Sequence, residues 1–388
     1  MTALLTLQQG SVDAKPEEAG MDPQRLELLD AHFARLIEAG KLQGASYLVS
    51  RYGRIVVNKA QGKLTYKADS AELRTDSVRK VYSITKAVVA VAIMQLCEAG
   101  KLYLQQPVAG IIPEFDTNLH RSITIWHLLT HTSGLRADPG SNVEPYSLPW
   151  YEWWVREKKE KADAWESADW IKIILSGPLS AKPGERWAYC SAGFVLLSEV
   201  IARVSGMSFD AYVQTRIADS IGMSRSSFLV PEDLRAEVCF TGPWEEQGIV
   251  KPADLSTLPP RGGNGYYSTL EDLHKFGQTM LNGGIAPGTG EVVLGRRTVE
   301  AMVRNQLRGV PNNCWGGDVA DTQMALGWSL NHQDICTPGT FSHEGYGHSG
   351  LYIDPAEQLV VVYLVPNQAG WLPEAVINPR AIIWSALQ

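Results

Sequence analysis

Long hydrophobic runs, paired cysteines and an excess of basic residues are all missing from this 388-residue sequence. The most apolar stretch, residues 87–96, has about half the length that a bilayer requires, so we expect no membrane-spanning helix and no membrane partner. Residues 1–20 lack the basic and the long apolar segments of a signal peptide. These absences predict a cytoplasmic protein.

The five cysteines are odd in number and widely dispersed, and none forms a Cys-x-x-Cys pair. Neither a disulfide framework nor a zinc knuckle is therefore expected. This pattern agrees with a reducing compartment. The residues are Cys97, Cys190, Cys239, Cys314 and Cys336.

Positive charge is scarce, because the formal net charge is −7 and the sequence pI is about 5.7. Residues 156–161 are rich in charge but mix both signs, which is typical of a solvated surface. Nucleic acid is therefore not expected as a partner.

Several catalytic and cofactor motifs are missing or stand in the wrong context. The sequence has no Gly-x-Ser-x-Gly nucleophile elbow and no Walker-type phosphate loop. A Gly-x-Gly-x-x-Gly match at 345–350 runs into a predicted strand, whereas a dinucleotide fingerprint opens a helix. His127 and His131 are four apart but lack the glutamate of a His-Glu-x-x-His zinc site, so we expect them to cap or pin a turn. No cofactor and no metal are predicted.

The composition is that of a globular protein, with 45% hydrophobic and 20% charged residues. Apolar periodicity predicts helices, β-branched runs predict strands, and Tyr52-Gly53 predicts a hairpin turn. The predicted helices are 20–40, 84–99, 125–129, 168–175, 194–204, 209–217 and 374–387, and the predicted strands are 45–50, 54–57 and 359–365. Pro379 is expected to kink or delay the last helix. We expect a sheet made from both ends of the chain, with a mostly helical insertion between them.

The helix predicted at 84–99 is apolar on nearly every side, which is typical of a helix in the centre of a protein. Ser83 stands at its start, and Lys86 follows three residues later on the same face. A serine hydroxyl needs a base to become a nucleophile. Burial would lower the pKa of Lys86 from its ordinary value of about 10.4. Ser83 is therefore a candidate nucleophile and Lys86 its candidate base, with a helix N-cap as the alternative for Ser83.

A second Ser-x-x-Lys stands just upstream, at Ser77 and Lys80. It lies in a charged stretch with Asp76 and Arg79, and we predict a surface turn there. The motif alone does not choose between the two serines, but the buried helix favours Ser83.

Three further segments follow in order. Residues 126–135 contain His-Thr-Ser-Gly-Leu, Tyr189 precedes Ser191 by two residues, and 347–350 read Gly-His-Ser-Gly before the strand-like tail. With Ser83-Ile-Thr-Lys, this ordered set resembles the serine β-lactamase and penicillin-binding superfamily over residues 20–388. The resemblance is to its class C-like branch, and most of all to the family VIII carboxylesterases.

The resemblance implies an α/β (α+β) fold of the β-lactamase/DD-peptidase type, with an antiparallel sheet flanked by helices and a mostly helical domain. Residues 1–82 and 255–388 would form the sheet domain and residues 83–254 the helical domain. The active site would lie in the cleft between them.

The resemblance also implies roles for individual residues. Ser83 would be acylated, Lys86 and Tyr189 would share the general base and acid work, and the backbone N–H groups of Ser83 and Leu351 would form the oxyanion hole. The residues assigned to substrate binding are Ser191, His348, Ser349 and Gly350. We expect the Lys86 ammonium to lower the pKa of the Tyr189 phenol. A packing role is the alternative for Tyr189 and for His348.

Two positions depart from the pattern of a penicillinase. Ser191 replaces the usual asparagine, and His348 replaces the usual lysine of the third motif. A neutral imidazole supplies no fixed positive charge for the carboxylate of a β-lactam. The departures favour a carboxylesterase acting on a short-chain or aromatic small-molecule ester. The alternatives are an amide or D-aminopeptidase-type hydrolase, an acyltransferase, and a weak β-lactamase or penicillin-binding sensor. The oligomeric state is left open.

A tryptophan-rich stretch has two equally supported interpretations. In the first, it forms an aromatic wall over the acyl pocket. In the second, it packs the core of the helical insertion or forms an oligomer contact. Its aromatic residues are Trp150, Tyr151, Trp153, Trp154, Trp165 and Trp170.

Overall fold

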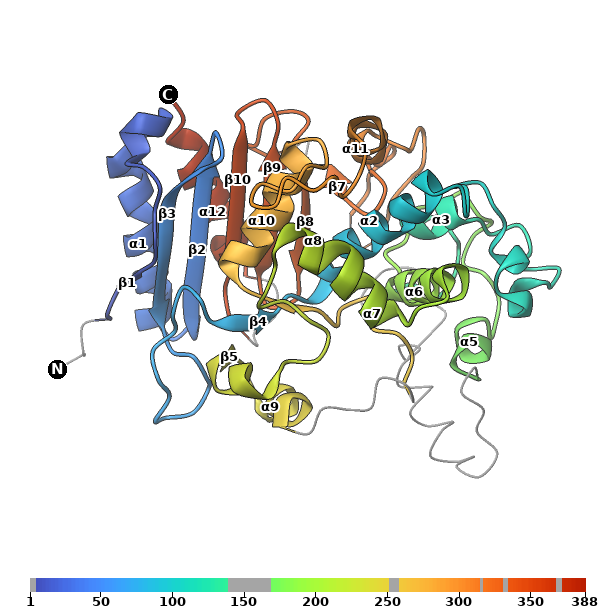
Figure 1. Ribbon diagram of the computed structural model, residues 1–388, viewed down its shortest axis with the longest axis horizontal. Helices are drawn as coiled ribbons and strands as arrows, with labels where there is room; N and C mark the ends of the chain where they lie inside the picture. The colour runs from blue at the N-terminus through green and yellow to red at the C-terminus, as the bar shows by residue number, and fades with distance from the viewer. Residues whose placement is uncertain (1–4, 139–168, 251–257, 315–316, 331–333, 368–371) are drawn as a thin grey trace.

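A seven-stranded antiparallel sheet forms the centre of the computed structural model (Figure 1). The structure describes residues 5–138, 169–250, 258–314, 317–330, 334–367 and 372–388. The strand order is β1-β3-β2-β10-β9-β8-β7, so both ends of the chain contribute to the sheet, as predicted. The strands are β1 Gln8–Gln9, β2 Gly44–Arg51, β3 Arg54–Gly62, β7 Ser329–Leu330, β8 Phe341–Gly345, β9 Ser349–Asp354 and β10 Leu359–Leu364.

The predicted hairpin joins β2 to β3. Tyr52 and Gly53 both have positive φ, at 54° and 73°, which is the backbone of the tight turns that match the twist of paired strands. The register across the hairpin shifts between Val49 and Ser50.

Helices bury both faces of this sheet (Figure 1). On one face, α1 Pro23–Glu38 and α12 Pro373–Ser385 pack with the side chains of alternate strand residues such as Tyr47 and Val361. On the other face, α10 Leu270–Leu281 packs with the intervening residues, such as Leu48 and Val360. Successive strand residues point to opposite faces, so β2 and β10 are apolar along their length because both faces are covered.

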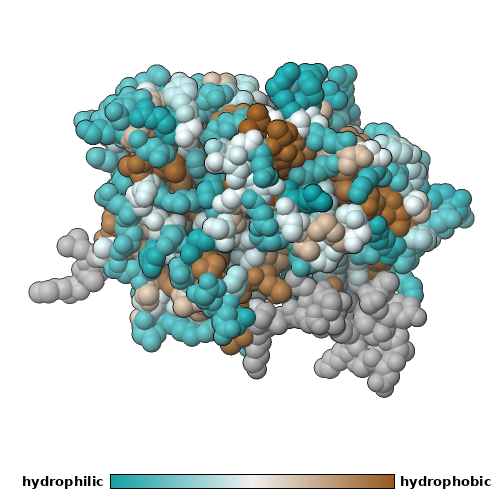
Figure 2. Space-filling model, viewed as in Figure 1, coloured by the Kyte–Doolittle hydropathy of each residue, from teal (hydrophilic) through white to brown (hydrophobic). Residues whose placement is uncertain are grey.

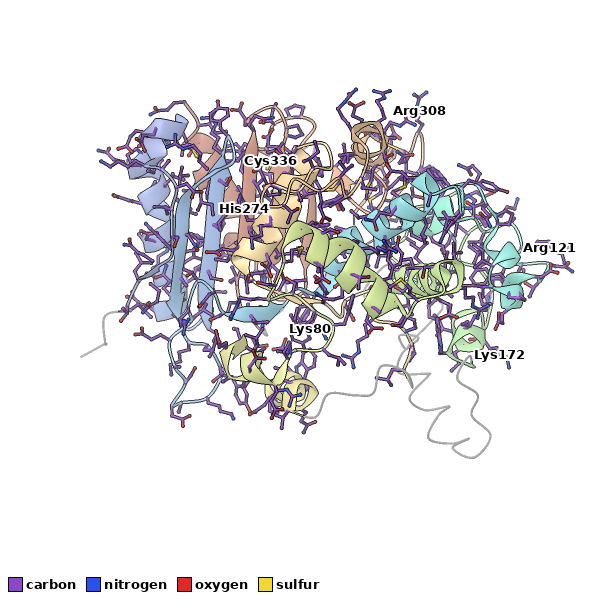
Figure 3. All side chains as sticks on the ribbon, in the orientation of Figure 1. Lys80, Arg121, Lys172, His274, Arg308 and Cys336 are labelled. Carbon is purple, nitrogen blue, oxygen red and sulfur yellow. The ribbon has the colours of Figure 1, made fainter. Side chains whose placement is uncertain are left out.

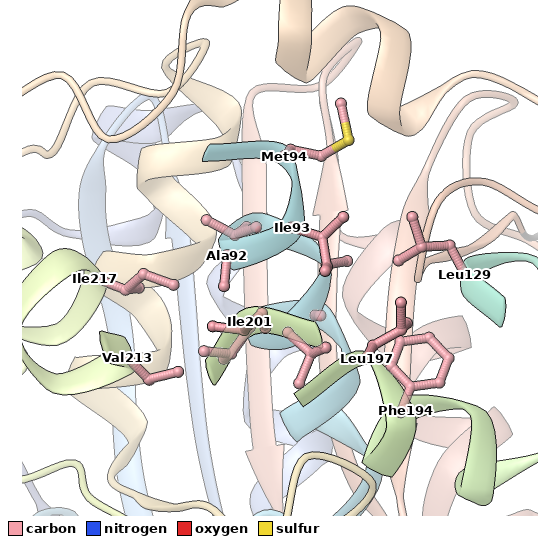
Figure 4. Close-up of a cluster of buried hydrophobic side chains, with 14 of the residues drawn as sticks. Ala92, Ile93, Met94, Leu129, Phe194, Leu197, Ile201, Val213 and Ile217 are labelled. Carbon is pink, nitrogen blue, oxygen red and sulfur yellow. The ribbon is translucent and has the colours of Figure 1, made fainter. Parts of the chain in front are cut away.

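The helix predicted at 84–99 is α2 Thr85–Glu98, and it is buried as expected. Its residues pack against α6 Ser191–Ser205 and the residues that follow α7 Phe209–Val213. Figure 4 shows Ala92 and Ile93 of α2 among side chains from these helices, with Leu197 and Ile201 of α6 on one side and Ile217 on another.

The remaining helical predictions are confirmed with shifted ends. The predicted helix 209–217 is interrupted by a π-helical turn, Gln214–Ala218, before α8 Asp219–Ile221. The other helices are α3 Ile125–Leu129, α5 Asp169–Ile174, α9 Pro243–Val250 and α11 Arg296–Val303. Short 3-10 turns lie at Pro16–Ala19, Tyr82–Ile84 (η2), Val108–Gly110, Pro113–Phe115 and Glu232–Glu237.

A small second sheet holds the segment before Ser83. Its order is β5-β4-β6, with β4 Val78–Lys80 between β5 Val238–Cys239 and β6 Tyr267–Ser268. The predicted turn at Ser77 is present, since the Ser77 N–H donates to the Arg74 carbonyl, but its predicted position at the surface is wrong. The Ser77 hydroxyl accepts a hydrogen bond from the Arg74 N–H, but both Ser77 and Arg79 are buried. The charges of this stretch misled the prediction because Arg79 is neutralised inside the protein by Glu245.

No single helix in the described ranges is long and apolar enough to cross a membrane. The face shown in Figure 2 is mostly hydrophilic, with apolar residues in small separate groups. The domain boundaries at 82/83 and 254/255 stay a prediction, and residue 254 lies outside the described residues.

Candidate active site

Ser83 lies in η2, the 3-10 turn that leads directly into α2. The turn is held by Thr85, whose hydroxyl donates to the Tyr82 carbonyl and accepts a bond from the Tyr266 N–H at 3.1 Å. The N-cap position of α2 is Ile84, and no side chain caps the helix. Ser83 is therefore not an N-cap of α2, and its hydroxyl is available to other groups.

Lys86 is the partner of that hydroxyl. Its Nζ donates to Ser83 Oγ at 3.0 Å and to the carbonyl of Gly263 at 2.7 Å, and the residue is fully buried. Burial lowers the pKa of Lys86 to about 8, although the Asp138 carboxylate acts in the opposite direction. A lysine with this pKa has an appreciable neutral fraction near neutral pH, as a general base requires.

Tyr189 completes a three-residue cluster. Its hydroxyl hydrogen-bonds with Ser83, and Lys86 Nζ lies 4.8 Å from the centre of its ring. The expected lowering of the Tyr189 pKa is wrong. Burial raises the pKa, Asp138 raises it further, and only the bond with Ser83 opposes them. Tyr189 therefore stands beside Ser83 as a neutral phenol that can donate a proton.

Two buried histidines that were not assigned to catalysis surround Lys86. His131 stacks on Tyr189 with ring centres 4.6 Å apart, and its Nδ1 accepts the Cys190 N–H at 3.0 Å. His343 lies in β8 and its pKa falls to about 3. Burial lowers the pKa of both histidines, and the nearby charge of Lys86 lowers it further. Both rings are therefore neutral and fill the space around Lys86 without adding charge.

Asp138 is a site residue that the sequence did not indicate. Its two carboxylate oxygens accept the Ser191 N–H at 2.7 Å and the Ser191 hydroxyl at 2.5 Å. An anion at the start of α6 is stabilised by the free N–H groups of the helix. Ser191, predicted to bind substrate, thus donates its hydroxyl hydrogen bond to Asp138. The residues are 53 apart in sequence, so no local pattern links them.

The third predicted motif lies at the turn between β8 and β9. The ring of His348 accepts the Leu372 N–H at 2.9 Å through Nε2, and burial lowers its pKa. Gly350 is required at its position because a Cβ would lie 2.5 Å from the Tyr363 ring and 2.7 Å from the Tyr352 ring. Ser349 and Leu351 are both fully buried in β9.

The end of β8, next to this turn, packs against the segment that carries the nucleophile. A Cβ on Gly345 would collide with the Val81 carbonyl, immediately before η2. The structure therefore brings β8 against the segment that carries Ser83. The substrate-binding roles of His348, Ser349 and Gly350, and the oxyanion role of Leu351, stay predictions.

Two other sequence interpretations concern metals and tryptophans. His127 caps α3, because its Nδ1 accepts the Thr124 N–H at 3.1 Å, as expected for a turn residue. Within the described ranges, no group of three His, Cys, Asp or Glu side chains could hold a metal ion. Most of the tryptophan-rich stretch lies outside the described residues, but Trp170 is buried in α5.

Comparison with known proteins gives a family and a similar esterase. The family model described as "Beta-lactamase" matches residues 29–383. Esterase EstB of Burkholderia gladioli is 29% identical, over 89% of this chain and 93% of that protein.

Solved structures agree in fold. EstCE1, a hydrolase with promiscuous acyltransferase activity, superposes with a TM-score of 0.74 at 17% identity, covering 93% of this chain and 99% of the other. A family VIII carboxylesterase superposes with a TM-score of 0.70 at 19% identity, covering 95% of this chain and 99% of the other.

Proposed function

The chain belongs to the beta-lactamase family, and we propose that it is a serine hydrolase that cleaves carboxylic esters through an acyl-enzyme. The observation that carries the proposal is the contact of Lys86 Nζ with Ser83 Oγ at 3.0 Å, together with the burial that lowers the pKa of the lysine to about 8. This contact pairs a hydroxyl with a base that has an appreciable neutral fraction near neutral pH.

In the acylation half, neutral Lys86 takes the proton of Ser83 as Oγ bonds to the ester carbonyl carbon. The carbonyl electrons move to the oxygen, and the backbone N–H groups of Ser83 and Leu351 are the proposed donors to this oxyanion. When the electrons return, the C–O bond to the alcohol breaks. The neutral phenol of Tyr189 gives its proton to the leaving oxygen and regains one from the Lys86 ammonium.

Deacylation runs through the same groups in reverse. Neutral Lys86 takes one proton from a water molecule, with Tyr189 passing it on, as the water oxygen bonds to the acyl carbon. Ser83 Oγ then leaves and receives that proton back from the Lys86 ammonium. The products are a carboxylic acid and regenerated enzyme. No group outside the cluster is needed for the proton balance.

An ester suits the site better than a β-lactam for two reasons. The Ser191 hydroxyl already donates its hydrogen bond to Asp138, so it is not offered to a β-lactam side chain. Burial lowers the pKa of His348, so its ring supplies no fixed positive charge for a ring carboxylate. The names of Esterase EstB and of the family VIII carboxylesterase support the same choice.

Acyl transfer to an alcohol is the second candidate. The acyl-enzyme is the same, and only the acceptor differs from water. The described acyltransferase activity of EstCE1 supports it. Adding an alcohol to an ester assay and measuring the transesterified product separates the two outcomes.

The experiment compares the two Ser-x-x-Lys serines with 4-nitrophenyl esters and a chromogenic cephalosporin. We expect Ser83→Ala to lower ester kcat by at least a thousandfold, since loss of a nucleophile that works with a base has this size of effect. Mass spectrometry should show an acyl adduct on the wild type and none on Ser83→Ala.

Ser77→Ala is the matched control, because it removes the upstream serine from a buried turn without touching Lys86. It should keep ester turnover. Normal turnover by Ser83→Ala would refute the nucleophile, and fast cephalosporin turnover with little ester hydrolysis would refute the choice of substrate.

A further inference from the structure

An aromatic and cationic cluster stands beside the nucleophile, between β4 and α9. We call it the β4–α9 subsite. Lys80 Nζ lies 5.0 Å from the ring centre of Tyr82 and 5.6 Å from that of Trp244, and Figure 3 places Lys80 in this region. Tyr82 meets Tyr346 edge to face, with ring centres 5.4 Å apart. Its members are Lys80, Tyr82, Trp244, Arg261 and Tyr346.

The backbone connects the subsite directly to Ser83. Tyr82 precedes Ser83 and has a φ of 47°, a left-handed conformation that turns the chain sharply at this point. Arg261 belongs to the same turn as Gly263. The carbonyl of Gly263 accepts a hydrogen bond from Lys86 Nζ. The same two segments that position the nucleophile and its base therefore carry the subsite.

The rings of the subsite are open to solvent on one side. Trp244 is 53% exposed and Tyr346 is 57% exposed, whereas Tyr82 beneath them is buried. Large exposed aromatic side chains beside a reactive group are typical of a ligand-binding surface.

Neither cation of the subsite forms an ion pair with a carboxylate of the described residues, although the charge of Glu245 acts on Lys80. In the described part of the chain, no carboxylate lies within 4.0 Å of Lys80 or Arg261. Glu245, the acidic residue nearby, is already occupied. It pairs with Arg79 at 3.7 Å and accepts bonds from Tyr82 and from Thr241.

The cations also act on each other. Burial and the nearby Arg261 charge together lower the pKa of Lys80 to about 8, although Glu245 acts in the opposite direction. An anion that binds near Lys80 and Arg261 would be attracted by both charges and would reduce their mutual repulsion. The rings would hold an apolar body next to that anion, and both ammonium and guanidinium groups bind carboxylates well.

We propose that the β4–α9 subsite binds a carboxylate carried by the substrate, so that the enzyme prefers anionic esters to neutral esters of the same size. This substrate class rests on the proposed ester hydrolysis. The carboxylate would meet Lys80 and Arg261 while the adjoining apolar part packs on Trp244 and Tyr346.

The test uses two matched substrate pairs. The mono-4-nitrophenyl ester of glutaric acid and 4-nitrophenyl pentanoate differ by a carboxylate on the acyl side. 4-Acetoxybenzoate and 4-acetoxytoluene differ by a carboxylate on the leaving group. For each pair, the ratio of kcat/KM for the anionic ester over the neutral ester is measured.

Lys80→Met and Arg261→Gln should each lower this ratio about tenfold for at least one pair, mainly through KM, since a hydrogen bond between charged groups has this size of effect. Lys101→Met removes one positive charge from an exposed site at the end of α2 and should leave the ratio unchanged. Salt should lower the ratio of the wild type by screening. Unchanged ratios in both subsite variants would overturn the proposal.

A binding measurement separates this proposal from ester hydrolysis itself. In Ser83→Ala protein, titration calorimetry measures the binding of benzoate to the subsite without any ester hydrolysis. The Kd for benzoate should rise about tenfold when Lys80→Met is added. An equal Kd refutes the subsite, whatever the kinetics of Ser83→Ala show about the nucleophile.

Discussion

At the scale of single residues, sequence proximity decided what could be predicted. Ser83 and Lys86 were predicted because they share one helix face, and their contact is present at 3.0 Å. The pKa of Tyr189 was predicted in the wrong direction, because the motifs indicate the charged neighbour Lys86 but not the burial of the phenol, which raises the pKa. Asp138 was missed because it reaches the site only through contacts with residues about fifty positions away.

The charge of Asp138 gives a pH prediction. Lys86 acts as a base when neutral, so kcat/KM should rise with pH and level off above about pH 8. The Asp138 carboxylate favours the ammonium form and raises the pKa of Lys86. Asp138→Asn keeps an oxygen for the Ser191 N–H but removes the charge. The rising limb of the profile should therefore move to lower pH, by about one unit.

The measurement is a pH–rate profile of ester hydrolysis under kcat/KM conditions. Asp116→Asn is the control, since Asp116 is an exposed carboxylate that pairs only with Arg121 among the described residues. Its profile should match the wild type. A profile that stays in place in Asp138→Asn, or moves to higher pH, would show that Asp138 does not act on Lys86 through its charge.

At the scale of elements, strong apolar periodicity was sufficient to predict a helix and its ends. Elements that depend on close packing with distant segments could not be predicted. α2 lies within one residue of its predicted ends because a long apolar run between a serine and a glycine has few alternatives. The short strand β4 and the π-helical turn at 214–218 were not predicted. Both depend on neighbours from distant segments. In β4 these neighbours pair with its three residues, and in the π-helical turn they change the winding of the helix.

Two glycines inside helices show that the effect of a glycine-to-alanine substitution on stability depends on the packing around the residue as well as on helix propensity. A Cβ on Gly277 of α10 would lie 2.8 Å from Val360 and 3.0 Å from Leu351, so the helix rests on the sheet through this gap. Gly277→Ala should therefore lower the free energy of unfolding by about 1–3 kcal/mol. Because Leu351 is the displaced neighbour, ester kcat should fall as well.

Gly248 of α9 has nothing within 4 Å of an added Cβ. Gly248→Ala should raise the free energy of unfolding by about 0.5–1 kcal/mol, since alanine loses less chain entropy in a helix. Urea unfolding followed by circular dichroism measures both variants. Effects of the same sign would contradict the packing argument.

At the scale of the whole molecule, the chain ends meet in one sheet. β2 pairs with β10 along its length, which joins residues more than 300 positions apart. The strand-like runs near both ends of the sequence predicted this arrangement, but no spacing rule gives the register. The site depends on that closure, because η2 comes from the first part of the chain and the β8–β9 turn from the last.

Arg380 is the residue through which the last helix is tied to that sheet. It lies in α12, is 7% exposed, and pairs with Asp334 at 2.6 Å and with Glu344 of β8 at 2.6 Å. It also donates to the Tyr352 hydroxyl of β9 at 2.6 Å. Removing this buried cation leaves the partly buried carboxylates of Asp334 and Glu344 without a counter-charge.

We therefore expect Arg380→Ala to lower the free energy of unfolding by about 3–5 kcal/mol. Arg297→Ala breaks an exposed pair with Glu300 and should change it by less than about 1 kcal/mol. Ester kcat should fall in Arg380→Ala more than in Arg297→Ala at a temperature where both are folded, since β8 also abuts η2. If the two variants unfold at the same urea concentration, α12 is not held to the sheet by this network, and its burial against α1 would have to supply the attachment instead.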